Sequence, residues 1–428
     1  MLDNFDIIEH SMVTLSSVKK YSKKAVRTVK NEGLVSLGIK SLQKIQKRQQ
    51  SQSTVAEKKK QFISLVDREN VMLADWSGSP YKHDHVIKRN AKRIAWIMSP
   101  PAGGGGHQNI FRFIDFLDKR GYKNDVYLYS TFDDTTIDQA HLNTQKYSNA
   151  KNTKFYYYDK NLSIDADVLF ATGWETAYPA FNHRTAALKF YFVQDFEPLF
   201  YPMGTEYILA ENTYKFGFQG ITAGGWLAKK LKSEYGMKTD NYDFGANQDL
   251  YRVTNTAERK CVFFYARPVT ERRGFDLGLM ALELFHEEMP DYEIHMAGWD
   301  VSEWNVPFPY VNHGAMPMSE LNGVYNNSAA ALVMSLTNMS LLPLELLASG
   351  TVPVVNKGDN NTLVSNNENI VYVEPSPQAL ADALVAAVKA NNSSQLSKSI
   401  SESVPRDGWD ISGEKFISII ENEINHGK

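Results

Sequence analysis

A pair of carboxylates surrounded by aromatic residues occupies the segment YFVQDFEPLFYP, at 191–202. The apolar run before it predicts a strand, whose end brings together an amide, two carboxylates and two rings: Gln194, Asp195, Glu197, Phe196 and Tyr201. Proteins hold sugars with such groups, through hydrogen bonds to the hydroxyls and contact with the C–H face of the ring. Carboxylates also supply the acid or base in glycoside-processing sites. A loop packed on the core is the alternative interpretation.

A run of four glycines at 103–106 precedes His107, where an apolar run at 93–100 gives way to an amphipathic stretch. Glycine lets a backbone approach a ligand closely, and the first turn of a helix offers unpaired N–H groups to an anion. The run matches neither the dinucleotide-binding G-x-G-x-x-G pattern with its acidic partner nor a phosphate-binding loop followed by Gly-Lys-Ser/Thr. We expect Gly104 and Gly105 to approach a ligand, with a purely structural turn as the alternative.

Two arginines follow another apolar run, in the segment FFYARPVTERRG at 263–274. Arg267 ends the predicted strand, and Arg273 comes six residues later, directly before a predicted helix. Guanidinium groups at the mouth of a parallel sheet suit a diphosphate, which arginine holds through paired hydrogen bonds. A solvated basic turn is the alternative. We interpret Arg272 as the solvated member of the adjacent pair, although spacing alone does not separate it from Arg273.

A single carboxylate, Glu345, lies in the otherwise apolar segment SLTNMSLLPLELLASGTVPVV at 335–355. It belongs to a predicted helix at 342–349 that ends at Gly350. A carboxylate in such surroundings needs a hydroxyl or a cation as partner to offset its desolvation. The ribose hydroxyls of a nucleotide would serve, and a salt bridge to a neighbouring side chain is the alternative.

We find no sequence pattern for a metal site or an organic cofactor. The DAD sequence at 165–167 precedes its predicted strand, whereas a ligand site would follow one. The chain has one cysteine, which excludes an internal disulfide and a zinc site built from cysteines. We therefore expect the protein to work without a metal or cofactor.

Short apolar runs alternate with helical stretches through most of the chain, in two series separated by a polar segment at 241–253. The first series predicts strands at 93–100, 125–130, 154–159, 167–172, 189–195 and 218–223. The second predicts strands at 260–268, 292–299, 310–315, 330–336, 351–358 and 369–375, and helices at 274–288, 318–326, 342–349, 377–390 and 409–424. This alternation is typical of an α/β fold with two doubly wound parallel sheets and a ligand cleft at the carboxyl ends of the strands.

The chain has 428 residues and a net charge of −3, which conceals an uneven distribution. Residues 1–60, the basic segment, hold 13 Lys/Arg and 5 Asp/Glu, so they carry +8 and the other 368 residues carry −11. Residues 17–50 contain no proline and show helical apolar spacing. Such a helix can lie on an anionic membrane, with packing on its own body or on a twin subunit in a homodimer as the alternative. Nucleic acid is not an expected partner, because the segment is nearly free of aromatics.

The composition also limits the cellular compartments in which the protein is expected. Hydrophobic residues make up 43% of the chain, enough for real cores. No stretch approaches the roughly 18 uninterrupted apolar residues of a membrane span, and the first residues lack a signal-peptide core. The single cysteine suits a reducing compartment. We expect a cytoplasmic protein at the inner face of the cell membrane.

The motifs resemble those of GT-B glycosyltransferases of the large retaining family four, over about residues 90–425. They are most similar to the bacterial rhamnosyltransferase WsaF group, through YFVQDFEPLFYP, FFYARP and FGFQGITAGGWL at 216–227. The resemblance implies two Rossmann-like domains facing a cleft, after an N-terminal helical extension. The boundaries that we expect are 1–65 for the extension, 66–245 for the acceptor domain, 246–405 for the donor domain and 406–428 for a helix that crosses back.

The resemblance also assigns the donor site. Arg267 and Arg273 match an Arg and a Lys that hold the donor diphosphate, and the glycine run matches a loop lying over that diphosphate. Glu345 matches the second Glu of a Glu–seven residues–Glu pattern that binds the nucleotide ribose. Ser340 and Leu341 match a loop whose backbone contacts the phosphates.

Two positions depart from the family pattern. Thr337 stands where the first Glu of that pattern would fall, which suggests a deoxy sugar such as rhamnose. Gln194 stands where the family usually has a His, and Asp195 takes the place of the acid after it. We assign catalysis to Asp195 and Glu197, and acceptor contact to His107, Gln194, Phe196 and Tyr201.

The expected reaction is transfer of L-rhamnose from dTDP-β-L-rhamnose to a sugar hydroxyl of a growing bacterial surface polysaccharide. The acceptor would be lipid-linked or a polysaccharide, and the sequence does not fix thymidine over uridine in the donor. A nucleotide-sugar epimerase or phosphorylase on the same scaffold is one alternative, because a fold does not determine its chemistry. A non-catalytic glycan-binding subunit is the other.

Overall fold

The computed structural model describes residues 65–82, 92–102, 104–149, 152–390 and 393–426. The basic segment and the helix and membrane contact predicted for it lie outside these residues. Within them, no helix combines the length and the apolar character needed to cross a bilayer.

The first sheet has seven parallel strands in the order β3-β2-β1-β4-β5-β6-β7. Its strands are β1 Arg93–Met98, β2 Lys123–Leu128, β3 Lys154–Tyr157, β4 Val168–Ala171, β5 Leu188–Val193, β6 Gln219–Ala223 and β7 Thr239–Tyr242. Its helices are α2 Arg68–Leu73, α3 Gly105–Lys119, α4 Ile137–Thr144, α5 Trp174–Asn182, α6 Thr205–Asn212 and α7 Gly225–Tyr235, with short turns η1 Glu197–Phe200 and η2 Thr213–Lys215. Nearly every residue of β1, β4 and β5 is buried, as expected for a parallel sheet covered on both faces.

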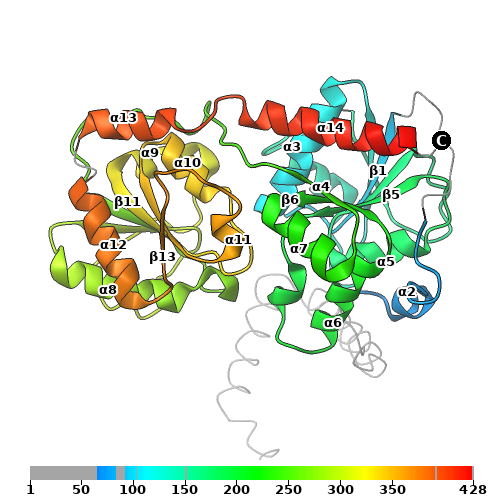
Figure 1. The fold of residues 1–428 in the computed structure, drawn as a ribbon, viewed down its shortest axis with the longest axis horizontal. Helices are drawn as coiled ribbons and strands as arrows, with labels where there is room; N and C mark the ends of the chain where they lie inside the picture. The colour runs from blue at the N-terminus through cyan, green and yellow to red at the C-terminus, as the bar shows by residue number, and fades with distance from the viewer. Residues whose placement is uncertain (1–64, 83–91, 103, 150–151, 391–392, 427–428) are drawn as a thin grey trace, which may run out of the picture. The chain divides into compact units, whose positions relative to one another are not determined.

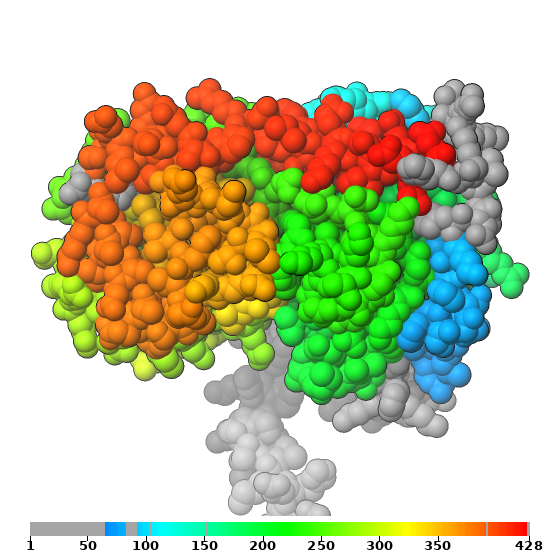
Figure 2. Space-filling model, viewed as in Figure 1, coloured from blue at the N-terminus to red at the C-terminus, as the bar shows by residue number. Residues whose placement is uncertain are grey.

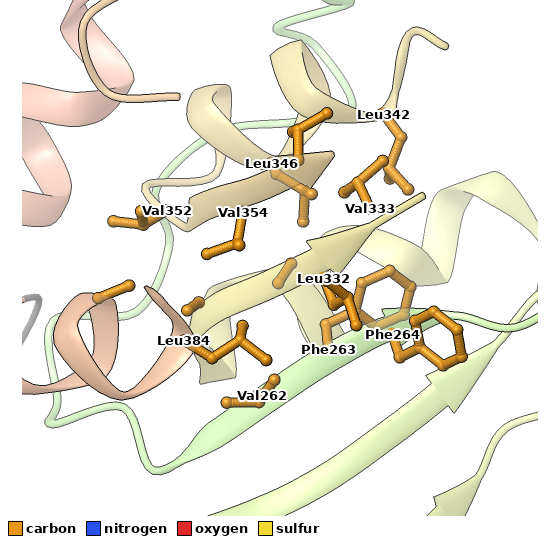
Figure 3. Packing of buried hydrophobic residues seen from close by; sticks show 14 of the residues in the cluster. Val262, Phe263, Phe264, Leu332, Val333, Leu342, Leu346, Val352, Val354 and Leu384 are labelled. Atoms are coloured by element: carbon orange, nitrogen blue, oxygen red, sulfur yellow. The ribbon is translucent and has the colours of Figure 1, made fainter. Parts of the chain in front are cut away.

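The second sheet has six parallel strands in the order β10-β9-β8-β11-β12-β13. Its strands are β8 Cys261–Tyr265, β9 Glu293–Ala297, β10 Val311–Asn312, β11 Ser328–Val333, β12 Val352–Asn356 and β13 Val371–Val373. Its helical segments are η3 Glu271–Arg273, α8 Phe275–Glu288, α9 Met318–Asn327, α10 Leu342–Ala348, α11 Asp359–Thr362, α12 Pro377–Ala390 and α13 Ser394–Glu402. Leu346 of α10 and Leu384 of α12 approach the strands from opposite faces (Figure 3), so this sheet also lies between two helical layers.

The predicted α/β class with two doubly wound parallel sheets is confirmed. All strands within a sheet run the same way, so their carboxyl ends lie along one edge, where the loops after β1, β5, β8 and β11 begin. One strand was missed: β7 has the polar sequence TDNY, lies at the end of its sheet and overlaps the first two residues of the segment interpreted as a linker. The helix α13 was also missed, and α3 begins at Gly105 rather than near Ile110.

The last helix, α14 Gly408–His426, packs on the first sheet although it follows the second in sequence. Figure 1 shows it beside α3, and Figure 2 shows its side chains lying on those of the first domain's elements. Its Phe416 is fully buried and stacks on Phe113 at 4.6 Å and on Phe170 at 5.6 Å between ring centroids. The ring of Phe416 therefore belongs to the core of the first domain.

We expect Phe416→Ala to lower the free energy of unfolding by about 3–5 kcal/mol, because it leaves a cavity among buried rings. Urea denaturation followed by circular dichroism measures the change. Ile411→Ala on the same helix is the control, because Ile411 is 55% exposed. Equal losses in the two variants would contradict the packing of α14 on the first core.

Candidate functional site

Asp195 follows β5 and faces loops that belong to the second sheet. Its Oδ1 accepts a hydrogen bond from the N–H of Phe196 at 2.8 Å, and its Oδ2 accepts one from the Thr337 hydroxyl at 2.9 Å. The Nε of Arg272 lies 3.9 Å from the same Oδ2. Burial raises the pKa of the Asp195 carboxyl, and Arg272 and Arg273 oppose that rise. This carboxylate is therefore shared between the carboxyl edges of the two sheets.

Arg267 and Arg273 lie at the same edge of the second sheet, as their positions after β8 predicted. Arg267 donates from Nη1 to the carbonyl of Gly298 at 3.2 Å, and Arg273 donates from Nη1 to the Ser335 hydroxyl at 2.6 Å. Burial lowers the pKa of Arg273, Asp195 opposes that change, and Arg272 and Arg267 add to it. Arg272 and Arg273 thus interact with the Asp195 carboxylate, and Arg267 adds a third positive charge that acts on Arg273, which leaves an excess of positive charge.

Arg272 is part of this cluster, so its interpretation as the solvated arginine is wrong. Its guanidinium lies 4.1 Å from the centre of the Phe200 ring, and its side chain is 33% exposed. Its Nε is buried and, within the described part of the chain, has no hydrogen-bond partner. Both arginines interact with Asp195, and Arg272 differs from Arg273 in its contact with Phe200 of the first domain, about which sequence spacing carries no information.

Glu345 lies half-buried on α10 and interacts electrostatically with a cation from the first domain. Burial raises its pKa to about 7, while Arg112 and a hydrogen bond with Tyr251 oppose the rise. Arg112 belongs to α3, and its guanidinium lies 3.9 Å from the centre of the Trp409 ring on α14. Arg112 was not predicted as a site residue, because its only signal was a lone arginine within an amphipathic helix.

The loop between β11 and α10 is held by a set of amides. The carbonyl of Ser335 accepts hydrogen bonds from the side-chain amides of Asn356, Asn360 and Asn361, at 2.9–3.0 Å. Farther along the loop, Asn338 donates to the backbone carbonyls of Gln194 and Ala223, at 3.0 and 3.2 Å. Asn338, which no motif indicated, therefore ties this loop to the ends of β5 and β6.

The predicted phosphate-contacting residues occupy the end of the same loop. Ser340 has a buried hydroxyl without a hydrogen-bond partner among the described residues, and Leu341 is the N-cap of α10. A buried hydroxyl without a partner is costly and suits a polar ligand. The structure thus leaves a hydroxyl available for hydrogen bonding at the beginning of α10.

Three of the four glycines, at 104–106, lie at the beginning of α3, and Gly106 is beside Gln194. Gly104 is the N-cap and Gly105 the first residue of the helix. A methyl group on either would meet no atom within 4 Å, whereas one on Gly106 would lie 3.4 Å from Nε2 of Gln194. Gly104 has a φ of −68°, which other residues adopt equally well. The protein itself therefore does not require these two glycines, and the open space beside them suits a ligand; Gly103 lies outside the described residues.

The residues predicted for acceptor contact bond mainly to their own domain. The Nε2 of His107 lies 3.2 Å from the Ser99 hydroxyl, and burial lowers the pKa of this imidazole. Other contacts are those of Gln194 with Asn109 at 3.2 Å, of Tyr201 with Trp174 at 3.0 Å, and of the buried ring of Phe196 with Tyr214. Their contact with an acceptor stays a prediction.

Glu197 faces the interior of the first domain. It is 6% exposed, and its Oε2 accepts hydrogen bonds from the N–H of Trp174 at 2.6 Å and the hydroxyl of Tyr191 at 3.0 Å. Burial raises its pKa well above the usual range, and the neighbouring Glu175 adds to the rise. These contacts give Glu197 a structural role at the beginning of α5, and its role in catalysis stays a prediction.

Metal-ligand types meet at one place in the described part of the chain, outside this site. Cys261, Glu293 and His295 each place one ligand atom within 4.8 Å of the others. They lie in β8 and β9, and Cys261 begins the strand whose other end leads to Arg267. Burial raises the pKa of the Cys261 thiol to about 11, so the group is a neutral thiol rather than a thiolate ligand at neutral pH.

Comparison with known proteins places both halves of the chain in one family. The model of the WsaF C-terminal domain matches residues 260–385, and that of the WsaF N-terminal domain matches residues 131–223. The O-antigen biosynthesis protein RfbC of Myxococcus xanthus is 30% identical over 358 residues, which are 79% of this chain and 28% of RfbC. The chain therefore spans less than a third of the length of that relative.

Solved structures share the fold at low sequence identity. A glycosyltransferase from Rickettsia africae has a TM-score of 0.57 at 14% identity, covering 78% of this chain and 99% of its own. HepE from Anabaena, in complex with UDP and glucose, has a TM-score of 0.57 at 13% identity, covering 77% and 99%. A TarM mutant of S. aureus, in complex with Fondaparinux, α-GlcNAc-glycerol and UDP, has a TM-score of 0.60 at 11% identity, covering 78% and 100%. The fold is GT-B.

The raised pKa of Glu345 predicts a pH-dependent loss of stability. Its folded-state pKa of about 7 lies above the ordinary 4.5, so ionisation opposes folding and stability falls as the pH rises between these values. Glu345→Gln removes this contribution. Urea denaturation of both proteins gives the free energy of unfolding of the variant minus that of the wild type. We expect this difference to increase by about 2–3 kcal/mol from pH 4.5 to pH 8.

Other buried carboxylates titrate in both proteins, so their contributions cancel when the free energies of unfolding of the variant and the wild type are subtracted. Glu283→Gln, at an exposed position on α8, is the matched control and should show a difference that does not vary with pH. A difference between wild type and Glu345→Gln that is constant with pH would contradict the burial of an ionisable carboxyl at this position.

Proposed function

We propose that this chain, which belongs to the WsaF family, is a glycosyltransferase that moves a sugar from a nucleotide-sugar to a sugar hydroxyl of a bacterial surface polysaccharide. The observation that carries the proposal is the group of three interacting arginines, Arg267, Arg272 and Arg273, two of which, Arg272 and Arg273, also interact with Asp195. The positive charge of the guanidinium groups complements the negative charge of a diphosphate. The carboxylate lies beside them, where we place the bond between the diphosphate and the sugar. The similarity to an O-antigen biosynthesis protein supports a polysaccharide product.

The donor diphosphate is assigned to the arginines. As the bond between sugar and diphosphate breaks, negative charge develops on the leaving oxygen, and cations held at that place stabilise it. Arg267 and Arg273 take this role without a metal in our proposal. The open space beside Gly104 and Gly105 lets the diphosphate approach the first turn of α3, and the Ser340 hydroxyl offers a further hydrogen bond.

The nucleotide ribose is assigned to Glu345. Its carboxyl is buried and has Arg112 and Tyr251 as neighbours, so hydroxyl donors would offset its desolvation. The base and the sugar belong to the finer part of the proposal, dTDP-β-L-rhamnose. Thr337 supports a deoxy sugar, because a hydroxyl at this position replaces the carboxylate that family members place near the sugar's hydroxyls.

Asp195 is assigned to the reacting sugar. Its carboxylate is held by the Thr337 hydroxyl and by Arg272, which oppose the effect of burial on its pKa. An ionised carboxylate here would orient the acceptor hydroxyl or stabilise positive charge on the sugar ring. Closure of the domains around the donor would exclude water, which otherwise hydrolyses it.

A thermal-shift screen across nucleotide-sugars tests the donor. A ligand at about 100 times its dissociation constant adds about 2.7 kcal/mol of stability, which is readily measured. We expect dTDP-β-L-rhamnose to stabilise the wild type and Arg273→Gln to weaken its binding roughly tenfold or more, because a charge-assisted hydrogen bond is lost. Asp195→Asn is the matched variant: it should keep donor binding and lose at least about 100-fold in turnover.

Two outcomes of this screen would contradict the proposal at different levels. Stabilisation by uridine donors but not by thymidine donors would overturn the donor assignment and leave the transfer reaction standing. Absence of stabilisation by any nucleotide-sugar, together with the absence of turnover, would overturn glycosyl transfer itself and favour a glycan-binding subunit.

We also propose that the basic segment holds the protein at an anionic membrane, where a lipid-linked acceptor would be located. Its 13 Lys/Arg support this, since each basic residue near such a surface adds about 1 kcal/mol. Vesicles with and without phosphatidylglycerol test it in a flotation assay with the full chain. Replacing Lys19, Lys20, Lys23 and Lys24 by Gln should reduce flotation with the anionic vesicles.

The control replaces four exposed lysines of the described residues, Lys123, Lys154, Lys389 and Lys398. These changes should leave flotation unaltered. Equal flotation of both variants and the wild type would overturn the membrane contact and favour packing of the basic segment on protein.

A further inference from the structure

A cavity of about 380 Å³ lies at the carboxyl ends of β1, β2 and β3. Pro100 after β1, Ser130 after β2 and Tyr158 after β3 contribute to its wall, and α2 closes it through Asp67 and Asn70. Its volume falls within the usual range of small-molecule sites. None of the residues assigned to donor, acceptor or catalysis above lines it, so the proposed reaction leaves this cavity without a role.

The chemistry of the lining combines aromatic rings with carboxylates. Tyr157 lines the cavity and is 54% exposed, so its ring is accessible to a ligand. Among the described residues, the acidic ones that line the cavity are Asp67, Glu69, Asp133 and Asp159, whereas Lys160 is the one lining cation and pairs with Glu69 at 2.7 Å. An aromatic ring beside carboxylate oxygens suits the C–H face and the hydroxyls of a sugar.

The carboxylates are held in place by the loops that carry them. Asp133 accepts hydrogen bonds at Oδ1 from the N–H and the hydroxyl of Thr135, at 2.8 and 2.6 Å. Asp159 accepts one at Oδ1 from the N–H of Asn161 at 2.7 Å. Within the described residues, the second oxygen of each of these two carboxylates has no hydrogen bond. Each acid is thus fixed by one oxygen and offers the other to a ligand.

The wall formed by α2 is also fixed to the sheet. The hydroxyl of Tyr129 accepts hydrogen bonds from the N–H of Asp67 at 3.0 Å and from the side-chain amide of Asn70 at 3.4 Å. Asn70 in turn accepts a hydrogen bond from Asn182 of α5 at its backbone carbonyl, at 2.8 Å. The cavity is therefore bounded by residues whose positions do not depend on a ligand.

The cavity opens on the same edge of the sheet as the proposed transfer site. Pro100 lines it, and the glycine run begins three residues later. Along the edge, β2 is separated from β5, which leads to Asp195, by β1 and β4. Three strand spacings of about 4.8 Å put the cavity roughly 14 Å from that carboxylate. This separation exceeds the width of one sugar ring, so the residue that receives the transferred sugar cannot fill both places.

We propose that this cavity is a subsite for a neutral sugar residue of the acceptor glycan, distinct from the residue whose hydroxyl receives the transferred sugar. The inference rests on the proposed function, since it takes the acceptor to be a glycan that extends along the carboxyl edge of the first sheet. The excess of carboxylates over the single paired lysine selects against the diphosphate of a lipid carrier and against acidic sugars. The subsite would therefore hold the acceptor by its already polymerised part.

Binding of neutral oligosaccharides to the full chain tests the subsite, with rhamno-, manno- and galacto-oligosaccharides as probes in isothermal titration and saturation-transfer NMR. Tyr157→Ala and Asp133→Asn change exposed lining residues. We expect each to weaken binding of the oligosaccharide that the wild type prefers by roughly tenfold. For an oligosaccharide that serves as acceptor, its KM should rise while kcat stays unchanged.

The matched controls lie beside the two variants in sequence and outside the cavity. Tyr156 precedes Tyr157 on β3 and packs its ring on Tyr127, so Tyr156→Ala removes a ring from the other face of the strand. Asp134→Asn neutralises the exposed acid next to Asp133. Both controls should bind the oligosaccharide as the wild type does.

Equal binding by all four variants, preference for an acidic oligosaccharide, or no saturable binding of any neutral probe to the wild type would each overturn the subsite. Stabilisation by the donor nucleotide is measured in the same samples. A wild type that binds the donor but none of the oligosaccharides contradicts the subsite alone, whereas a wild type that is not stabilised by any nucleotide-sugar contradicts the proposed function.

Discussion

The site depends on three interacting guanidinium groups held at one edge of the second sheet, with the Asp195 carboxylate to balance two of them, Arg272 and Arg273. Burial lowers the pKa of Arg273, and the neighbouring arginines lower it further, so this cluster is electrostatically unfavourable without an anion. Asp195 neutralises part of the charge from the opposite domain, and a diphosphate would neutralise the rest. The contact between the domains and the affinity for the donor thus have the same physical origin.

The fold supplies the rigidity that such a cluster needs. Like charges stay together only where their side chains and loops have few other conformations, and the three amides on the carbonyl of Ser335 fix the loop that receives Arg273. Asn338 then ties that loop to the ends of β5 and β6. On the other side, α14 places Trp409 under Arg112, which faces Glu345. A helix that follows the second sheet in sequence therefore supports Arg112, a side chain of the first domain.

The sequence was sufficient for the parts of the structure that depend on local pattern. Continuous apolar runs predicted the buried strands, and β7 was missed because a polar strand at the end of a sheet lacks that pattern. Arg267 and Arg273 were predicted because a strand end fixes where they lie. The sequence could not predict the roles of Arg272, Arg112 and Asn338. Their partners come from distant segments, and their roles arise only when both domains are folded. Glu197 shows the converse, because its spacing from Asp195 did not reveal that it turns toward α5.

Asp195 and Glu197 are two residues apart and burial raises the pKa of both, yet the charges that surround them act in opposite directions. Glu197 lies near another carboxyl, Glu175, and both burial and that neighbour raise its pKa. For Asp195, the arginines oppose the rise that burial causes. A diphosphate bound to those arginines would take over part of their charge, so the support for the ionised form of Asp195 would weaken when the donor is present. The carboxylate would then be a better proton acceptor in the donor complex than in the free protein, and when the diphosphate leaves, the full charge of the arginines would again favour release of that proton.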